Sequence, residues 1–433
     1  MPLAFGRKAG TPFGVLVGVM AVLSLPSSAA AYTEKTLYAF CSLKGCKDGS
    51  EPMGELAMDA SGNLYGTTYA GGHRQSYPGY GTVFEFLPGT GQYSELYKFC
   101  SMGTPCPDGA HPGHVRLVID TGGNLYGATE TGGNSNGGGV VFELVRKSSG
   151  WREKILYTFC SRRQCADGSM PLAGLTYAGA AAGELYDGTS PLYGTTWGGG
   201  ANCSGDCGTV YSLTPKLGTK KWTESVLYSF CSQTNCADGQ EPDSALTLDS
   251  AGNIYGTTLL GGQSIDSGTV FELSPNGADY AQSVLYSFSD GIVPRGGIVM
   301  DGAGNLFGNT EGGGSDQDGL IFELSPNGGQ WQYSVLADFD GSNGGGPEGQ
   351  LLLDAKGNLF GTTYVGGIKD KGTVFEFNGS LQSLYSFCPQ KRCADGSYPV
   401  AGVIEDGEGN LFGTTTNGAH KNSGTIFELS VGH

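Results

Sequence analysis

A repeated heptapeptide constrains the fold of this chain more than any other feature. Gly-Asn-Leu-Tyr-Gly-Thr-Thr stands complete at 62–68, and six related copies follow at intervals of 52 to 67 residues. The central glycines of the seven copies are Gly66, Gly127, Gly194, Gly256, Gly308, Gly361 and Gly413. A regular period of this length is typical of a fold built from repeated small sheets. We therefore expect one large repeat domain, although 433 residues could hold two or three ordinary domains.

Each repeat unit contains four predicted strands. In the fourth full unit the strands are predicted at 244–249, 253–258, 268–273 and 283–288, with turns rich in glycine, serine and asparagine between them. Pro275-Asn276-Gly277 predicts the hairpin turn between the last two strands. Four antiparallel strands without helical periodicity are typical of a propeller blade. The sequence therefore predicts an all-β, seven-bladed β-propeller with four-stranded blades that spans residues 32–433.

The strand array is out of phase with the ends of the chain. A fourth-type strand at 37–40 precedes the first complete unit, whereas the last unit, at 401–429, has only three strands. We expect the first strand to complete the last blade and close the ring, because this pairing removes an exposed sheet edge. An open array with a frayed strand at each end is the alternative.

An aromatic residue precedes the central glycine of every motif, as Tyr65 precedes Gly66. Glycine inside a strand usually marks the close approach of another group. We therefore expect aromatic rings of one blade to pack on the glycine backbone of the next blade.

Residues 1–31 are predicted to be a signal peptide. Arg7 and Lys8 precede an apolar run at 13–25, which leads to small residues ending at Ala31. The run is shorter than the roughly 20 apolar residues that a membrane-spanning helix needs. No later segment reads as a membrane span or an anchor. We therefore expect a secreted or periplasmic protein.

The charge of the chain excludes some partners. Removal of residues 1–31 takes away two of 24 basic residues and none of 41 acidic ones, so the net charge changes from −17 to −19. Such acidity argues against a nucleic acid partner. It favours solubility and repulsion between copies, and we expect a monomer.

The twelve cysteines form six close pairs, a pattern that indicates local disulfides in an exported protein. Zinc is the alternative, but zinc sites usually need four ligands with tighter spacing, and the chain has only five histidines. Each disulfide would close a loop of about six residues and contribute about 2 kcal/mol. The predicted disulfides are Cys41–Cys46, Cys100–Cys106, Cys160–Cys165, Cys203–Cys207, Cys231–Cys236 and Cys388–Cys393.

The repeat unit also resembles a known family. Each unit combines the heptapeptide with a following Gly-Gly and then with Gly-Thr-Val-Phe-Glu-Leu or a close variant. In these motifs it is similar to the GloVer repeat of choice-of-anchor tandem repeat proteins, an exported bacterial family of no established activity. The resemblance covers 37–429 and implies an exported repeat scaffold. Relatives differ in their C-terminal sorting anchors, and this sequence departs from them because it shows none.

Two sets of loops are predicted to lie on one face of the propeller, where variable loops on a rigid frame commonly bind ligands. The loops after the fourth strands each contain Asp-Gly, whose carboxylates could coordinate a cation such as calcium. The alternative is that these aspartates only stabilise turns. Another set of aspartates, which follows the first strands as Asp59 does, is interpreted as turn residues on the opposite face. The candidate cation ligands are Asp48, Asp108, Asp167, Asp238, Asp290, Asp340 and Asp395.

Aromatic residues follow several copies of the motif and make a glycan-binding face the first functional hypothesis. Sugar sites combine flat rings with hydrogen-bonding groups. The alternative for each ring is that it caps the edge of a neighbouring blade. The candidate ligand-binding residues are Tyr69, Trp197 and Tyr364, with His73, Arg74, Tyr77 and Tyr80 in the longest loop.

Two other functions remain open. An extracellular hydrolase or lyase would use carboxylates or histidines of several inner strands in the central channel. Neither a serine-centred elbow nor His-Glu-x-x-His occurs, and the acidic residues repeat too evenly to assign catalytic roles. The insertion at 180–190 is the clearest break in the repeat. A scaffold for protein interaction, which needs no pocket, is the third hypothesis. We rank binding of an extracellular glycan or protein above catalysis.

Overall fold

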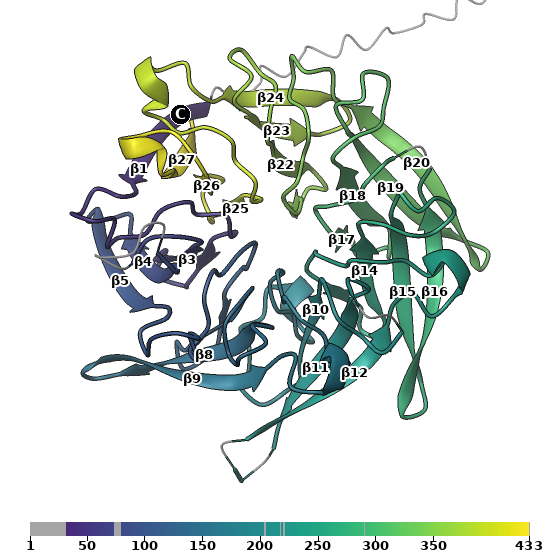
Figure 1. Ribbon diagram of the computed structural model, residues 1–433. Coiled ribbons are helices and arrows are strands. Elements are labelled where there is room, and N and C mark those ends of the chain that lie inside the picture. The colour runs from purple at the N-terminus through teal and green to yellow at the C-terminus, as the bar shows by residue number, and fades with distance from the viewer. Residues whose placement is uncertain are drawn as a thin grey trace, which may run out of the picture.

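The structure, a computed structural model, describes residues 32–72, 79–202, 205–216, 218–219, 221–289 and 291–432. In these residues seven antiparallel sheets stand around a central axis (Figure 1). The predicted seven-bladed β-propeller is confirmed.

Blades 1 to 3 follow the chain from the axis outward. Blade 1 consists of β2 (Ala57–Met58), β3 (Leu64–Thr68), β4 (Thr82–Leu87) and β5 (Gln92–Lys98). Blade 2 consists of β6 (Val118–Ile119), β7 (Leu125–Thr129), β8 (Val140–Lys147) and β9 (Gly150–Thr158). Blade 3 consists of β10 (Leu192–Thr196), β11 (Thr209–Pro215) and β12 (Trp222–Ser229).

Blades 4 to 7 complete the ring. Blade 4 consists of β13 (Thr247–Leu248), β14 (Ile254–Thr258), β15 (Thr269–Asn276) and β16 (Asp279–Ser287). Blade 5 consists of β17 (Ile298–Met300), β18 (Leu306–Thr310), β19 (Leu320–Asn327) and β20 (Gln330–Asp338). Blade 6 consists of β21 (Leu352–Leu353), β22 (Leu359–Thr363), β23 (Thr373–Phe377) and β24 (Leu381–Ser386). Blade 7 consists of β25 (Ile404–Glu405), β26 (Leu411–Thr415), β27 (Thr425–Val431) and β1 (Tyr32–Ala39).

Short 3-10 turns are the helical segments of the described residues. They are η1 (Arg163–Cys165), η2 (Ala180–Ala182), η3 (Thr234–Cys236), η4 (Lys391–Cys393) and η5 (His420–Asn422). Within the described ranges, we find no helix with the length and apolar character needed to cross a membrane.

The ring closes as predicted. β1 pairs antiparallel with β27, from Tyr32 opposite Val431 to Ala39 opposite Thr425. Figure 1 shows the two ends of the described chain side by side in blade 7. The first strand therefore supplies the outermost strand of the last blade.

The innermost strands are shorter than the sequence predicts. In blade 4 the expected strand at 244–249 is reduced to β13, and in blade 3 only the bridge between Thr176 and Tyr193 marks its place. In blade 4 a side-chain bond lies beside the shortened ladder, since the Ser244 and Thr257 hydroxyls are 2.8 Å apart. The predicted turn at 275–277 is also shifted, because β15 extends to Asn276 and pairs with Asp279.

The blades are joined by pairs of aromatic rings. At each of the seven junctions, a ring that follows the outermost strand of one blade meets a ring from the third strand of the next, with centroids 4.8 to 5.3 Å apart. Such pairs are stabilising beyond the area that they bury. The pairs are Phe40–Phe84, Phe99–Phe142, Phe159–Tyr211, Phe230–Phe271, Phe288–Phe322, Phe339–Phe375 and Phe387–Phe427.

The central glycine of the motif makes room for one ring of each pair. Gly66 stands opposite Phe84 in the ladder, and a Cβ on Gly66 would lie 2.6 Å from Phe84 Cζ. The other six motif glycines have the same relation to the third strand of their own blade. Our expectation that the ring comes from a neighbouring blade is therefore wrong. The ring belongs to the adjacent strand of the same blade, lies over the glycine and also contacts the preceding blade.

Candidate functional site

The two sets of loops lie on the same face, which we call the loop face. The backbones of Ser50, in the loop before blade 1, and Ala70, after β3, bond to each other in both directions at 2.9 and 3.1 Å. Corresponding bridges join the two loops in five further blades, at Ala110–Thr131, Ser169–Gly198, Gln240–Leu260, Gly345–Val365 and Ser397–Asn417. The predicted placement of the loops is confirmed.

A ring of residues surrounds the channel on the loop face, and we call it the mouth ring. Each member directly follows the second strand of its blade. In each blade a proline leads into the inner strand, and the member donates its backbone N–H to the carbonyl of the residue before that proline, at 2.9 to 3.2 Å. The mouth ring is Tyr69, Glu130, Trp197, Leu259, Glu311, Tyr364 and Thr416. Three of the aromatic residues predicted to bind ligand therefore share one structural position.

The predicted aromatic residues form one cluster and two separate sites. Tyr69 packs on His111, with ring centroids 4.8 Å apart, and Tyr80 packs on the same histidine at 5.7 Å. Tyr364, which is 38% exposed, packs on Tyr398 at 5.0 Å in another blade. Trp197 stands alone among the candidates, half-buried in blade 3. Three further candidates, His73, Arg74 and Tyr77, lie outside the described residues.

The Asp-Gly carboxylates lie between blades. Asp48 is fully buried, and it accepts hydrogen bonds from Tyr38 Oη and the Ser42 backbone N–H, both at 2.8 Å. Four others are equally buried and each accepts a bond from a tyrosine of an outermost strand, namely Asp108, Asp167, Asp238 and Asp395. Asp340 is exposed and bonds within its own turn, and Asp290 is outside the described residues. These five buried carboxylates thus face the outer strands and not the channel.

In the described part of the chain, His, Cys, Asp and Glu side chains form no group of three or more suited to a metal ion. Calcium binding by the Asp-Gly sites stays a prediction. Five of the predicted disulfides are present, at Cys41–Cys46, Cys100–Cys106, Cys160–Cys165, Cys231–Cys236 and Cys388–Cys393. Cys207 is also disulfide-bonded, and its predicted partner Cys203 lies outside the described residues.

The central channel holds a charged cluster that the repeat does not share. A cavity of about 50 Å³ lies on the axis, lined by residues of all seven blades. Each blade contributes one residue to a layer around this cavity. That residue stands three positions before the recurring Leu, Ile or Val of the inner strand. That layer is Met53, His114, Leu172, Asp243, Arg295, Glu348 and Val400, of which all but Leu172 line the cavity. Charged residues occupy this layer in the consecutive blades 4, 5 and 6.

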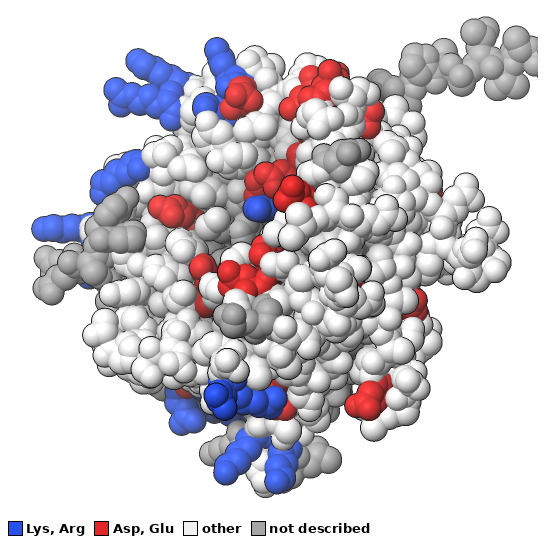
Figure 2. Space-filling view, turned by 45° about the vertical axis from the view of Figure 1, so that its right-hand side comes forward, with Lys and Arg blue, Asp and Glu red and all other residues white. Residues whose placement is uncertain are grey.

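Ion pairs tie this layer to its neighbours along the axis. Arg295 Nη1 lies 3.6 Å from Glu348 Oε2, and Arg295 Nε lies 3.2 Å from Oε2 of Glu311 in the mouth ring. One step further into the channel, Arg116 Nη1 lies 3.1 Å from Glu55 Oε1. Figure 2 shows acidic side chains around the central hollow of one face, with a basic side chain among them. The channel is therefore lined by two groups of ion pairs, one around Arg295 and one between Arg116 and Glu55.

Burial shifts the pKa values of several groups in this cavity, including those of Glu55 and Glu348, which it raises. It raises the pKa of Asp243 to about 7, although the nearby Arg295 partly offsets the effect, and Glu348 adds to it. Asp243 Oδ1 is buried without a hydrogen-bond partner among the described residues. Burial lowers the pKa of His114 to about 4, and the charge of Arg295 acts in the same direction. At neutral pH the histidine is uncharged, and Asp243 is divided between its two forms.

The channel widens toward the opposite face into a cavity of about 690 Å³. Glu55, Arg116 and Gln350 line both cavities, so the two adjoin at these residues. Ala180 and Ala181 of η2 also line the wide cavity, which places the insertion beside the axis. The predicted break in the repeat thus changes the channel on the face away from the loops.

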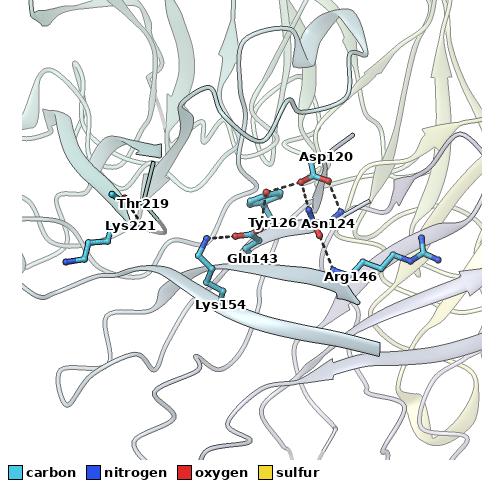
Figure 3. A network of polar contacts seen from close by, with 8 residues as sticks. All are labelled: Asp120, Asn124, Tyr126, Glu143, Arg146, Lys154, Thr219 and Lys221. Atoms are coloured by element: carbon cyan, nitrogen blue, oxygen red, sulfur yellow. Dashed lines mark hydrogen bonds and ion pairs between the residues drawn. The ribbon is translucent and has the colours of Figure 1, made fainter. Parts of the chain in front are cut away.

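The aspartates interpreted as turn residues have that role on the opposite face. Figure 3 shows the turn of blade 2, where Asp120 Oδ1 accepts the Asn124 backbone N–H at 2.8 Å and Oδ2 accepts Tyr126 Oη at 3.0 Å. In the same network Lys154 Nζ donates to Glu143 Oε2 at 2.7 Å. The same N–H contact, to the residue four positions on, recurs at Asp59, Asp249, Asp301, Asp354 and Asp406.

The predicted site residues do not include Asp243, Arg295 and Glu348. A usable signal was present, because each follows a recurring proline at a position where the other blades carry uncharged residues or His114. Glu130 and Glu311 were missed in the same way, since they occupy the position of Tyr69 in other units.

The repeat has a counterpart among known families. A family model described as the Gloeobacter/Verrucomicrobia repeat matches residues 27–191, 178–334 and 290–433. No curated protein matches the chain.

Three solved structures resemble the chain at low identity. The extracellular domain of a candidate one-component system from B. thetaiotaomicron is 12% identical with a TM-score of 0.49, and the match covers 91% of this chain but only 39% of that one. A candidate 6-phosphogluconolactonase from Bacteroides uniformis is 14% identical with a TM-score of 0.45. The periplasmic gluconolactonase PpgL of Pseudomonas aeruginosa is 14% identical with a TM-score of 0.47. Each of these two matches covers 76% of this chain and 83% of the other. Matches this distant carry no argument about activity.

Proposed function

Because this chain belongs to the Gloeobacter/Verrucomicrobia repeat family, whose repeats build the whole ring, we propose that its function resides in the residues that differ between repeats. We infer that the loop face binds an extracellular glycan across the mouth ring. The observation that carries this proposal is the placement of Tyr69, Trp197 and Tyr364 at one position around the channel.

The chemistry of the mouth ring supports a carbohydrate ligand. Aromatic rings with one apolar face and a nearby polar group are suited to sugars, which present C–H faces and hydroxyls. Glu130 and Glu311 occupy the same ring and supply hydrogen-bond acceptors for such hydroxyls. His111 and Tyr398 support the rings of Tyr69 and Tyr364 from behind. Rings held in place in this way lose little freedom when a ligand binds.

We further propose that residues 1–31 direct export and that the protein is a monomer. The five disulfides of the described residues are typical of an extracellular or periplasmic protein. The alternatives to a glycan ligand are a protein ligand on the loop face and a purely structural role.

The test is a glycan array probed with the full chain and with three variants. Trp197→Ala and Tyr364→Ala should each weaken binding at least fivefold, because a stacked ring contributes about 1 kcal/mol or more. The matched control is Val335→Ala on the outer strand β20, where the side chain is 47% exposed and remote from the channel. An array with no binding, or one in which all three variants behave alike, would contradict the proposal.

A hydrolase or lyase in the channel is a second candidate, and one observation favours it. Asp243, Arg295 and Glu348 break the repeat in consecutive blades and line a cavity on the axis. Enzymes place carboxyl groups with raised pKa values in such positions. Incubation of the chain with the glycans that it binds, followed by chromatography for shorter products, tests this candidate. Products that persist in Asp243→Asn would exclude Asp243 as the acid or base.

A further inference from the structure

The wall of the cavity on the axis contains a carboxylate oxygen that has no hydrogen-bond partner among the described residues. Asp243 Oδ1 is buried in its wall without a partner among the described residues, which is a costly arrangement for a carboxylate. The guanidinium of Arg295 lies within ion-pair distance of Glu311 and Glu348, although its buried Nε makes no hydrogen bond to the described residues. A ligand that satisfies Asp243 must bring a hydrogen-bond donor.

The charge of the cluster favours a positively charged donor over a neutral or anionic one. Three carboxylates, those of Asp243, Glu348 and Glu311, surround the single positive charge of Arg295. His114 carries no charge at neutral pH, since burial holds its pKa at about 4. Glu55 and Arg116, one step deeper, form an ion pair and leave no excess of positive charge. The excess is negative, so an anionic ligand is repelled and a cationic donor is favoured.

The size of the cavity limits the group that enters. One water needs roughly 10 to 15 Å³ of such space, and the cavity has about 50 Å³. It therefore accepts a small group such as an ammonium with the carbon that bears it, but not a whole sugar ring. A primary ammonium has three donors and no acceptor, which complements the acceptors in this wall.

The mouth ring provides the connection to a larger ligand. Glu311 belongs to the mouth ring and also contacts Arg295 in the cavity layer. A sugar that lies against the aromatic residues of the mouth ring can thus direct one substituent toward Asp243. We propose that this cavity binds the free amino group of an amino sugar, through Asp243, Glu348 and Glu311. The inference rests on the proposed glycan binding and names the class of glycan.

The test compares two ligands of equal length, oligomers of glucosamine and of N-acetylglucosamine, by titration calorimetry on the full chain at pH 7. Acetylation removes the positive charge and adds bulk. We expect the glucosamine oligomer to bind at least tenfold more tightly. Asp243→Asn should remove this preference and leave the affinity for the acetylated oligomer unchanged. Glu408→Gln, a change of an exposed residue on a turn of blade 7, is the matched control and should keep the preference.

Three outcomes contradict the inference and are distinguishable. Equal binding of the two oligomers overturns the amino-group site while glycan binding stands. Binding of neither, on calorimetry and on the array, overturns both proposals. Equally tight binding of a lysine-containing peptide, abolished by Asp243→Asn, shows that the site accepts an ammonium of a protein and that the assignment to a glycan is wrong. Thermal melts of each variant confirm that the fold is retained.

Discussion

Asp243 places an unsatisfied carboxyl group at the centre of an otherwise repetitive ring. The equivalent positions in blades 3 and 7 hold Leu172 and Val400, which would be stable there without any partner. A buried acid in such a position reduces the free energy of unfolding once it ionises. The residue therefore carries a pH-dependent cost that its apolar counterparts avoid.

Replacement of Asp243 should reveal this cost. The folded-state pKa of about 7 exceeds the ordinary value of 3.8, so the native state binds the proton more tightly than the unfolded state does. The free energy of unfolding of the wild type should then fall as pH rises from 4 to 7. Asp243→Asn should lack this fall, which amounts to at most about 4 kcal/mol. Urea unfolding of both proteins at pH 4, 5.5 and 8 measures the difference.

The groups that face Asp243 are Arg295, Glu348, Glu311 and His114, and all four remain in the variant. Their own titration contributes to both proteins, so the difference between the two curves isolates Asp243. Parallel curves over this pH range would show that the carboxyl group titrates normally.

Motif glycines are under a steric constraint that differs from turn glycines. A Cβ on Gly256 would lie 2.7 Å from Phe271 Cζ and 2.8 Å from Leu246 Cδ2. Gly256→Ala should therefore lower the free energy of unfolding by about 1 to 3 kcal/mol through overpacking. Gly302→Ala is the control, because a Cβ there meets no atom within 4 Å. Equal melting temperatures for the two variants would mean that the side chain of Phe271 moves aside at little cost.

At the scale of elements, the strength of each blade lies in its outer three strands. These strands form long antiparallel ladders, whereas several inner strands consist of two residues. The alternation of apolar and polar residues predicts the strands of the long ladders well, since successive side chains of a strand point to opposite faces of the sheet. It fails for the inner segments, and in blade 4 the side-chain bond of Ser244 to Thr257 lies beside the shortened ladder.

The closing strand is an element whose removal can be tested. Deletion of 32–39 removes β1, uncovers the edge of β27 and leaves Tyr93 without the ring of Tyr38, which stacks on it at 4.3 Å. We expect the melting temperature to fall by many degrees. A synthetic peptide of residues 32–39, added to the truncated chain, should restore part of the loss. A truncated chain that melts like the full chain would show that β1 contributes little.

At the scale of the whole molecule, charge should steer ligands. The net charge is −17 for the full sequence, and acidic residues gather around the central hollow (Figure 2). A cationic oligomer should associate more slowly as salt rises from 0.05 to 0.5 M, because the Debye length falls from well above to below roughly 10 Å. Stopped-flow association measures this effect. The acetylated oligomer is the control, and a similar salt dependence for both would contradict charge steering.

The fold could be predicted from the sequence because each repeat carries the same local information seven times. Even the closure by β1 follows from counting fourth strands at 37–40 and 401–429. The cluster in the channel was not predicted, since Asp243, Arg295 and Glu348 are about one repeat apart in sequence and meet only when the ring forms. The sequence singles out Tyr69, Trp197 and Tyr364 as candidates because aromatic residues stand out beside the motif, and their role in binding stays a prediction.

The pairing of β1 with β27 also sets an order of events during synthesis. β1 is made before the other described strands, and its partner β27 is the last of them, so the outermost strand of blade 7 must wait until all the other described strands have been made. Contacts between such distant segments are slow to form. Until then, both strands present unpaired edges that can associate with other chains. Ring closure is therefore the step at which this protein is most exposed to misassembly.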